Sequence, residues 1–322
     1  MPGFTTHYIL GMKAYNDMPQ NNLKFIIAKY RWLYQLGLQG PDMFFYNIPI
    51  LRHRDYRNVG SYMHEHKVNA VFECCLRRIG TIRSRQQQEE AISYLAGFMN
   101  HYIADSICHP YVYGRIGYPV DAPTSMHHGM HAHLENELDA ILLWKYKKKK
   151  PSEFNQTATI CLNGQEIQFI SHFLASCINE TYYPITYRNN FQVTPAMVHR
   201  SIWALRFGCR TLSDKNGKKK FGIAQVESIF VNHPVASAKM VTDSVTDYRS
   251  SCNLNHEAWS NPWDPTRVST ASFVDLFHET LDKCSRVYAL LNSAVTDNMP
   301  LDKQDLSPLL TELGNESYHS GL

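Results

Sequence analysis

Apolar residues recur at helical spacing along most of the chain. Positions 23, 26, 27, 30 and 33 are one example, and the stretches 59–79 and 86–109 show the same period. We expect helices over residues 4–15, 21–36, 59–79, 86–109, 127–146, 165–182, 194–213, 221–247 and 270–294. Convincing strand alternation, heptad repeats and internal repeats are absent from the sequence. The pattern therefore predicts an all-α, multi-helix bundle.

The segments between these helices have the composition of loops. Residues 37–42 contain two glycines and a proline, and residues 110–126 are rich in Gly, Pro and Tyr. We expect Pro110 to end the preceding helix, because proline disfavours helical geometry in the residue before it. Residues 253–265 are expected to be an irregular connection, and roughly the last 25 residues are polar and expected to fray.

Composition and charge narrow the class of protein. The chain has 322 residues, of which 44% are hydrophobic and 19% charged, as in ordinary globular proteins. The net charge of +3 is too small to indicate nucleic-acid binding, and the lysines at 147–150 suit the end of a helix. The sequence lacks a long apolar span, a recognisable secretory signal and any C-x-x-C pair among its eight cysteines. We expect a soluble, cytoplasmic protein with reduced thiols.

Several histidines lie at helical spacing from carboxylates. His101, Asp105 and His109 are four residues apart twice over, which places them on one stripe of a helix. His131 and Glu135 repeat the spacing on a later helix. Imidazole and carboxylate ligands without thiolates suit catalytic zinc better than structural zinc. Either pair alone could be an ion pair on a helix surface, but their occurrence together favours a metal site between helices.

Further candidates stand in the same order as the motifs of a known family. The candidates are His7 in Gly3-Phe4-Thr5-Thr6-His7, Asp42 after Gly40-Pro41, and His64 between Met63 and Glu65. Asp42 alone could equally be a helix N-cap. Together with the two pairs, these residues make the chain resemble the zinc-dependent phospholipase C family, which shares its fold with fungal single-strand nucleases that use three zincs. The resemblance is carried by residues 1–146, and the helical remainder is similar to the bacterial intracellular branch.

The resemblance implies two or three Zn²⁺ ions and a role for each candidate. One zinc would be held by Asp42, His64, His101 and Asp105, and a second by His109, His131 and Glu135. A third would be held by His7 and by the amine of Pro2 if Met1 is removed, with Asp105 as the bridge. Asp42 would also be the base for the attacking water. His66, His133 and Glu137 are alternatives to His64, His131 and Glu135. The interval from Asp105 to His109 is four residues here and longer in secreted members.

These roles imply a single domain over residues 1–322, with a metal-binding core at 1–150 and a helical extension at 151–322. The implied activity is hydrolysis of a phosphodiester by metal-activated water, as in phospholipase C, with peripheral membrane contact as an option. Aromatic residues are candidates for the substrate mouth, where a choline-type headgroup would make cation–π contacts: Phe44, Phe45, Tyr46, Tyr111, Tyr113 and Tyr118. The alternatives are a single-strand nuclease or other phosphoesterase, and a metal-binding protein without turnover. We rank nucleic acid below phospholipid as a substrate.

Overall fold

A computed structural model describes residues 3–46, 59–183, 192–214, 216–230 and 237–322. The prediction of an all-α fold is confirmed. The α-helices, in chain order, are α1 (Phe4–Asp17), α2 (Asn22–Lys29), α3 (Arg31–Gly37), α5 (Val59–Glu65), α6 (Val68–Thr81), α7 (Arg85–Arg115), α8 (Ser125–Lys147), α9 (Gly164–Thr181), α11 (Pro195–Leu212), α12 (Lys218–Phe230), α13 (Tyr248–Ser251), α14 (Phe273–Thr296) and α15 (Ser307–Leu313). Short 3-10 helices are η1 (Gly40–Tyr46), η2 (Pro151–Glu153), η3 (Gln156–Thr159), η4 (Ser237–Lys239) and η5 (Leu301–Lys303). Strands β1 (Trp259–Asn261) and β2 (Asp264–Ser269) form an antiparallel pair.

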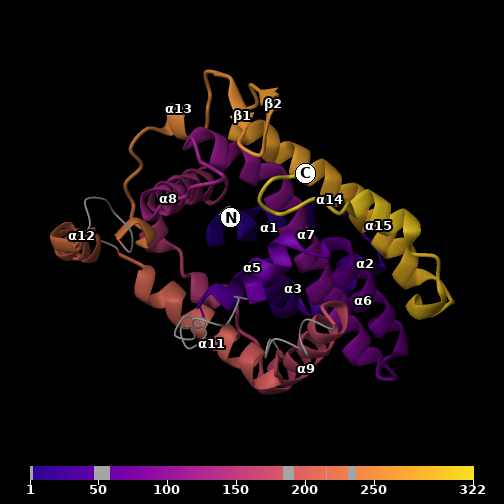
Figure 1. The fold of residues 1–322 in the computed structure, drawn as a ribbon. Helices are drawn as coiled ribbons and strands as arrows, with labels where there is room; N and C mark the ends of the chain where they lie inside the picture. The colour runs from indigo at the N-terminus through magenta and orange to yellow at the C-terminus, as the bar shows by residue number, and fades with distance from the viewer. Residues whose placement is uncertain (1–2, 47–58, 184–191, 215, 231–236) are drawn as a thin grey trace.

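Helix α7 is the central element, and α1, α2, α3, α6 and α14 pack around it (Figure 1). It is buried on nearly all sides from Glu90 to Val112, as expected of a helix enclosed by others. Its contact with α3 is backbone to backbone. A Cβ added at Gly97 would lie 2.1 Å from the carbonyl oxygen of Tyr34, and one at Gly37 would lie 2.1 Å from that of Tyr94. This close approach places η1, which follows α3, directly beside α7.

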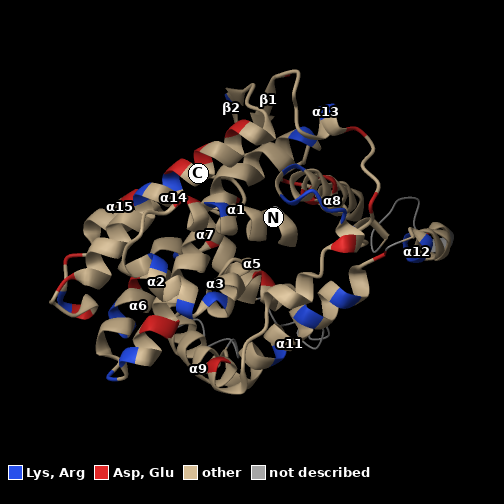
Figure 2. Ribbon diagram, turned by 180° about the vertical axis from the view of Figure 1, so that it is seen from behind, with Lys and Arg blue, Asp and Glu red and all other residues tan. Residues whose placement is uncertain are grey.

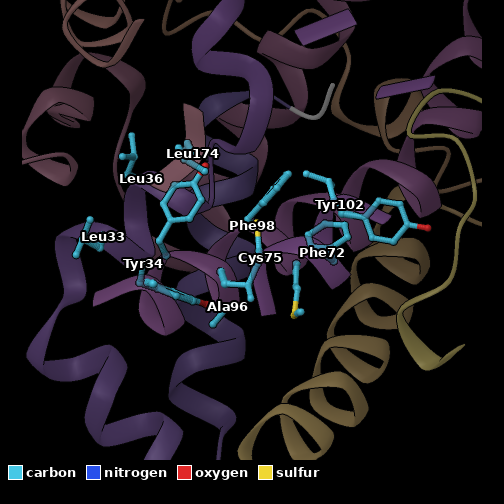
Figure 3. Packing of buried hydrophobic residues seen from close by; sticks show 14 of the residues in the cluster. Leu33, Tyr34, Leu36, Phe72, Cys75, Ala96, Phe98, Tyr102 and Leu174 are labelled. Carbon is cyan, nitrogen blue, oxygen red and sulfur yellow. The ribbon is translucent and has the colours of Figure 1, made fainter. Parts of the chain in front are cut away.

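The main hydrophobic core fills the space between α3, α6, α7 and α9 (Figure 3). Phe72 of α6 packs against Phe98 and Tyr102 of α7, with ring centroids 4.7 and 5.5 Å apart. The hydroxyl of Tyr34 donates to the carbonyl oxygen of Gly11 at 2.7 Å and lies 3.0 Å from the hydroxyl of Tyr288. These contacts join α1, α3 and α14 around α7.

The expected end of the central helix at Pro110 is wrong, since α7 continues to Arg115. Proline removes its own N–H from the helix ladder and its ring crowds the carbonyl four residues earlier, at a cost of about 3 kcal/mol. The turns beyond it are held by tertiary packing, because Tyr111 and Val112 are fully buried. Gly114 also lies against β1, where an added Cβ would be 2.6 Å from the carbonyl oxygen of Ser260.

Two predicted helices are each divided in two. The helix expected over 21–36 is interrupted at Tyr30, whose φ and ψ are −116° and 43°. The helix expected over 59–79 breaks at Lys67, which adopts a left-handed conformation with φ of 50°. Neither residue is a glycine or proline, so the sequence gives no warning of these breaks.

The second half of the chain departs from expectation in three places. The helix expected over 221–247 begins earlier, as α12, and ends at Phe230; residues 231–236 lie outside the described residues. The segment 253–265 contains β1 and part of β2, which are too short to show alternation. Residues after 297 do not fray as a whole, because η5 and α15 pack on α6 and α14 and Tyr318 is fully buried.

Candidate metal centre

Five elements deliver the candidate ligands to one region. Asp42 lies in η1, His64 in the last turn of α5, and His7 in the first turns of α1. The stripe His101, Asp105 and His109 comes from α7, and His131 and Glu135 come from α8. Gly40 allows η1 to approach, because it has φ of +45° and an added Cβ would lie 2.4 Å from Cδ2 of His101.

Asp42, His64, His101 and Asp105 form a buried first cluster. Nε2 of His64 lies 3.3 Å from Oδ1 of Asp42 and 3.6 Å from Oδ2 of Asp105. Nε2 of His101 lies 3.7 and 3.3 Å from the same two oxygens. None of these four atoms makes a hydrogen bond of normal geometry in the described structure. Two ligands that are each about 2.0–2.2 Å from a tetrahedral zinc lie about 3.3–3.6 Å apart, so this donor set fits the ion.

His109, His131 and Glu135 form a second, more open cluster. Oε1 of Glu135 lies 2.6 Å from Nε2 of His131 and 3.8 Å from Nε2 of His109. The side chains of His131 and Glu135 are each 14% exposed, whereas His109 is fully buried. The four-residue interval on a continuous α7 therefore carries His109 one turn past Asp105, to the side that faces α8.

Asp105 lies between His7 and the two histidines of the first cluster. Its Oδ2 faces His64 and His101, while its Oδ1 lies 3.1 Å from Nε2 of His7. The His7 ring stacks on that of His101 with centroids 4.1 Å apart. A carboxylate with its two oxygens turned toward different histidines has the arrangement of a bridging ligand. Pro2, the other residue expected at the third site, lies outside the described residues.

The alternative candidates do not join either cluster. His66 is 47% exposed, lies 3.9 Å from Glu65 and packs on Tyr62. His133 is also 47% exposed. Glu137 is turned toward a different part of the chain, where it accepts hydrogen bonds from the backbone of Thr246 and the hydroxyl of Ser251.

Backbone carbonyls orient three of the histidines. Nδ1 of His64 donates to Gly60 at 2.6 Å, Nδ1 of His101 to Leu38 at 3.1 Å, and Nδ1 of His109 to Tyr318 at 2.6 Å. A carbonyl oxygen only accepts, so the hydrogen of each neutral imidazole lies on Nδ1. The lone pair is then on Nε2, the atom that faces the clusters, which is the usual arrangement for a histidine that binds a metal.

The charges of the two clusters are strongly coupled. Burial alone would raise the pKa of Asp105, but His101, His109 and His7 hold that pKa well below its usual range. Burial lowers the pKa of His109 to about 4. Burial would also lower the pKa of His64, but Asp105 and Asp42 outweigh it and raise that pKa to about 9. A proton on His64 and a metal ion would compete for the same carboxylates, so metal binding should release protons.

Asp139 is a buried carboxylate that the sequence analysis missed. It accepts hydrogen bonds from the backbone N–H groups of Thr5 and Thr6, at 3.0 and 2.8 Å, and from the Thr6 hydroxyl at 2.7 Å. These bonds fix the start of α1, and with it His7, against α8. Burial raises the pKa of Asp139 to about 6. The sequence held a signal, since Asp139 continues the four-residue spacing of His131 and Glu135.

Some of the expected aromatic residues do border the second cluster. The ring of Tyr113 lies 4.6 Å from that of His131 and meets Trp263 edge-on at 4.9 Å, and Tyr118 stacks on Trp263. Beside them, a pocket of about 400 Å³ opens between the end of α7 and β1. The ring centroid of Phe45 lies 5.4 Å from that of His64, in the first cluster.

The expected role at the substrate mouth is wrong for two of the six aromatic residues and stays a prediction for Tyr46, which is half-buried. Phe44 and Tyr111 are buried in the core. Tyr46 packs on α11, where an added Cβ on Gly208 would lie 2.3 Å from its ring. The aromatic rim beside the second cluster is thus made of Tyr113 and Tyr118, with Trp263 as a member that the sequence analysis missed, and Phe45 lies against the first cluster.

Comparison with known protein families gives one match. A family model described as zinc dependent phospholipase C matches residues 6–186, which is more than half of the chain and includes His7 and both clusters. No curated protein and no solved structure matches significantly. In the described part of the chain, no helix is long and apolar enough to cross a membrane. The chain belongs to the zinc-dependent phospholipase C family.

Proposed function

We propose that this protein is a zinc-dependent phosphodiester hydrolase of the phospholipase C type. The observation that carries the proposal is the first cluster. Its two imidazole nitrogens and two carboxylates stand 3.3 to 3.7 Å apart without normal hydrogen bonds, as the ligands of one tetrahedral ion would. Polar atoms that are buried and unpartnered cost stability unless something binds them. A cation therefore suits this site better than an empty interior.

The donor set divides between two or three ions. Asp42, His64, His101 and Asp105 would hold one zinc, and His109, His131 and Glu135 a second. His7 would hold a third together with the chain's amino terminus, with Asp105 as the bridge. When bound, zinc lowers the pKa of a coordinated water to about 7 and stabilises negative charge on phosphoryl oxygens.

The chain's own residues supply position and proton transfer. We assign Asp42 as the base that orients the attacking water and takes its proton, because its carboxylate stands at the edge of the first cluster and is slightly exposed, unlike Asp105. The phosphate would enter from the side of the second cluster, whose histidine and glutamate reach solvent. The rim of Tyr113, Tyr118 and Trp263 lies on that side and suits a choline-type headgroup.

The other expectations from the sequence stay predictions. Lys and Arg residues are spread over several helices, among them α11 and α12, and do not gather along one face in this view (Figure 2). The lysines at 147–150 follow the end of α8 and those at 218–220 begin α12. No observation on the described residues favours a nuclease over a phospholipase.

Cytoplasmic location, peripheral membrane contact and a single domain over 1–322 likewise remain predictions.

The test compares substrates and a matched pair of variants. Zinc-loaded protein should hydrolyse a chromogenic phosphocholine ester faster than it degrades single-stranded DNA, and metal analysis should find more than one zinc per chain. His131→Ala should lose about one zinc and most of the activity, because its Nε2 lies 2.6 Å from Glu135. His133→Ala, on the same helix and exposed, is the control and should change neither. A folded protein that binds no zinc, or equal effects of the two variants, would reject the proposal.

A further inference from the structure

Residues 317–322 return from α15 and pass over α7 toward the metal centre (Figure 1). The backbone N–H of Tyr318 donates to the carbonyl oxygen of His64 at 3.1 Å, and the side-chain amide of Asn261 donates to that of Ser320 at 2.7 Å. Gly321 rests directly on α7, with φ of +62° and an added Cβ 2.5 Å from the carbonyl oxygen of Ser106. The segment is therefore held in one position by contacts along its length.

These contacts place His319 between the two clusters. Its ring is stacked 5.2 Å from that of His64, in the first cluster, and lies 5.6 Å from that of His109, in the second. The neighbouring Tyr318 is fully buried, whereas His319 is half-buried and keeps access to solvent. A hydrogen-bonding side chain thus stands where the two clusters meet the surface.

Nδ1 of His319 is engaged by a neighbouring tyrosine, which leaves Nε2 as the nitrogen for a ligand. The hydroxyl of Tyr113 lies 3.2 Å from Nδ1, and the same tyrosine borders His131. With the phenol donating to Nδ1, the ring hydrogen lies on Nε2, which is then a donor. His319 belongs to neither group of mutually close ligand atoms in the described structure. Its place is therefore beside the ligands and not among them.

We propose that His319 is a substrate-contacting residue, which donates a hydrogen bond from Nε2 to a non-bridging oxygen of a phosphoryl group bound between the two clusters. The inference rests on the proposed function. A donor held in place before the substrate arrives suits the negative charge that develops on phosphoryl oxygens, and removing one such donor commonly costs about 10²-fold or more in kcat. The ligand class is a phosphate mono- or diester, and inorganic phosphate is its simplest probe.

The test uses the zinc-loaded full chain and three variants. His319→Ala should retain its zinc, bind inorganic phosphate about tenfold more weakly in titration calorimetry, and lose about 10²-fold in kcat on the phosphocholine ester. His319→Gln, which keeps an N–H donor, should recover part of both losses. His172→Ala, an exposed histidine on α9, is the control and should match the wild type.

A second route displaces the segment without touching the imidazole. Gly321→Ala should reproduce both losses, because the new methyl group would meet the Ser106 carbonyl. If that variant does not fold, the comparison of alanine with glutamine at position 319 still decides. Unchanged phosphate affinity and kcat in His319→Ala would overturn the inference. A higher kcat would also overturn it, because residues 317–322 would then be a plug that blocks the site.

The phosphate titration separates this inference from the proposed function. If the zinc-loaded wild type cleaves neither substrate but binds phosphate in a way that depends on His319, the hydrolase assignment fails and the contact stands. If the wild type cleaves the ester and His319→Ala does so equally well, the hydrolase assignment stands and the contact fails.

Discussion

Replacing Asp105 with asparagine tests whether the carboxylate is a metal bridge or an internal ion pair. The side chain is fully buried, with Oδ1 3.1 Å from Nε2 of His7 and Oδ2 3.3 Å from Nε2 of His101. Asparagine has nearly the same shape, but one oxygen becomes an amide donor. Nε2 of His101 is an acceptor, since its Nδ1 donates to Leu38. Metal-free Asp105→Asn can form one hydrogen bond that the wild type lacks, but it loses the carboxylate that, with Asp42, raises the pKa of His64 to about 9. We therefore expect it to be less stable than the metal-free wild type.

The two proteins should differ once zinc is added. A ligand present at 1,000 times its Kd stabilises the native state by about 4.1 kcal/mol. The unfolding entropy is about 2.1 cal/mol/K per residue, which over 322 residues gives about 0.7 kcal/mol/K. Each zinc bound in this way should therefore raise the Tm by about 6 °C. At the same zinc concentration, a site weakened about a thousandfold gains only about 0.4 kcal/mol, which is less than 1 °C.

Thermal unfolding followed by circular dichroism gives the Tm without metal and its rise with zinc. Mass spectrometry gives the zinc content of each protein. Each protein is unfolded after chelation and again after zinc is restored. Asp243→Asn is the control, because Asp243 hydrogen-bonds to Ser152 outside both clusters, and it should keep the full response. An Asp105→Asn protein that keeps the full wild-type rise in Tm and the full zinc content would show that Asp105 is not a ligand. An Asp105→Asn protein as stable as the wild type without metal would refute the argument that the carboxylate stabilises a protonated His64.

Three further changes test the surroundings of the centre. Gly40→Ala should lower the free energy of unfolding by about 1–3 kcal/mol and weaken zinc binding, because φ is +45° and the methyl group would meet His101. Urea unfolding with and without zinc measures the stability and the zinc response. An unchanged midpoint would contradict this prediction. Lys148→Gly should raise the free energy of unfolding by about 1 kcal/mol at unchanged zinc content, because Lys148 ends α8 with φ of 54°, a conformation that glycine adopts without strain. A lower urea midpoint would count against this prediction. The pKa of Asp139 is raised to about 6, so the native state holds the proton of this carboxyl more tightly than the unfolded chain does. The protonated carboxyl therefore contributes its full share to the free energy of unfolding below about pH 4. That contribution falls by about 3 kcal/mol as the pH rises through 6. Asp139→Asn should flatten that slope in urea midpoints between pH 4.5 and 7.5, and parallel curves would refute the assignment.

The sequence predicts the centre well where spacing along one helix determines position. His101, Asp105 and His109 are fixed on one stripe by the helical repeat, and the structure brings all three into the two clusters. The outcome depended on α7 continuing past His109, which the presence of Pro110 argued against. The helix continues because the burial of Tyr111 and the contact with β1 outweigh the lost backbone bond and the crowding that Pro110 causes.

The orientation of the ligands could not be predicted in the same way. The Nδ1 atoms of His64, His101 and His109 are bonded to carbonyl oxygens of Gly60, Leu38 and Tyr318. Every residue carries a carbonyl group, so the sequence has no signal for which one will be used. Only the Gly60 carbonyl comes from the preceding turn of the same helix, whereas those of Leu38 and Tyr318 are 63 and 209 positions from the histidines they orient. Only the tertiary structure brings such partners together.

The part of the chain beyond the family match therefore has a direct role at the centre. The match ends at residue 186 and contains every ligand of the two clusters, which would make the remainder a scaffold. Yet the Tyr318 carbonyl orients His109, and partners of this kind commonly change metal affinity by about 10- to 100-fold. Trp263, also outside the match, completes the aromatic rim. If the matched residues supply the hydrolytic chemistry, the later residues are the ones placed to set the affinity of the second site and the choice of substrate.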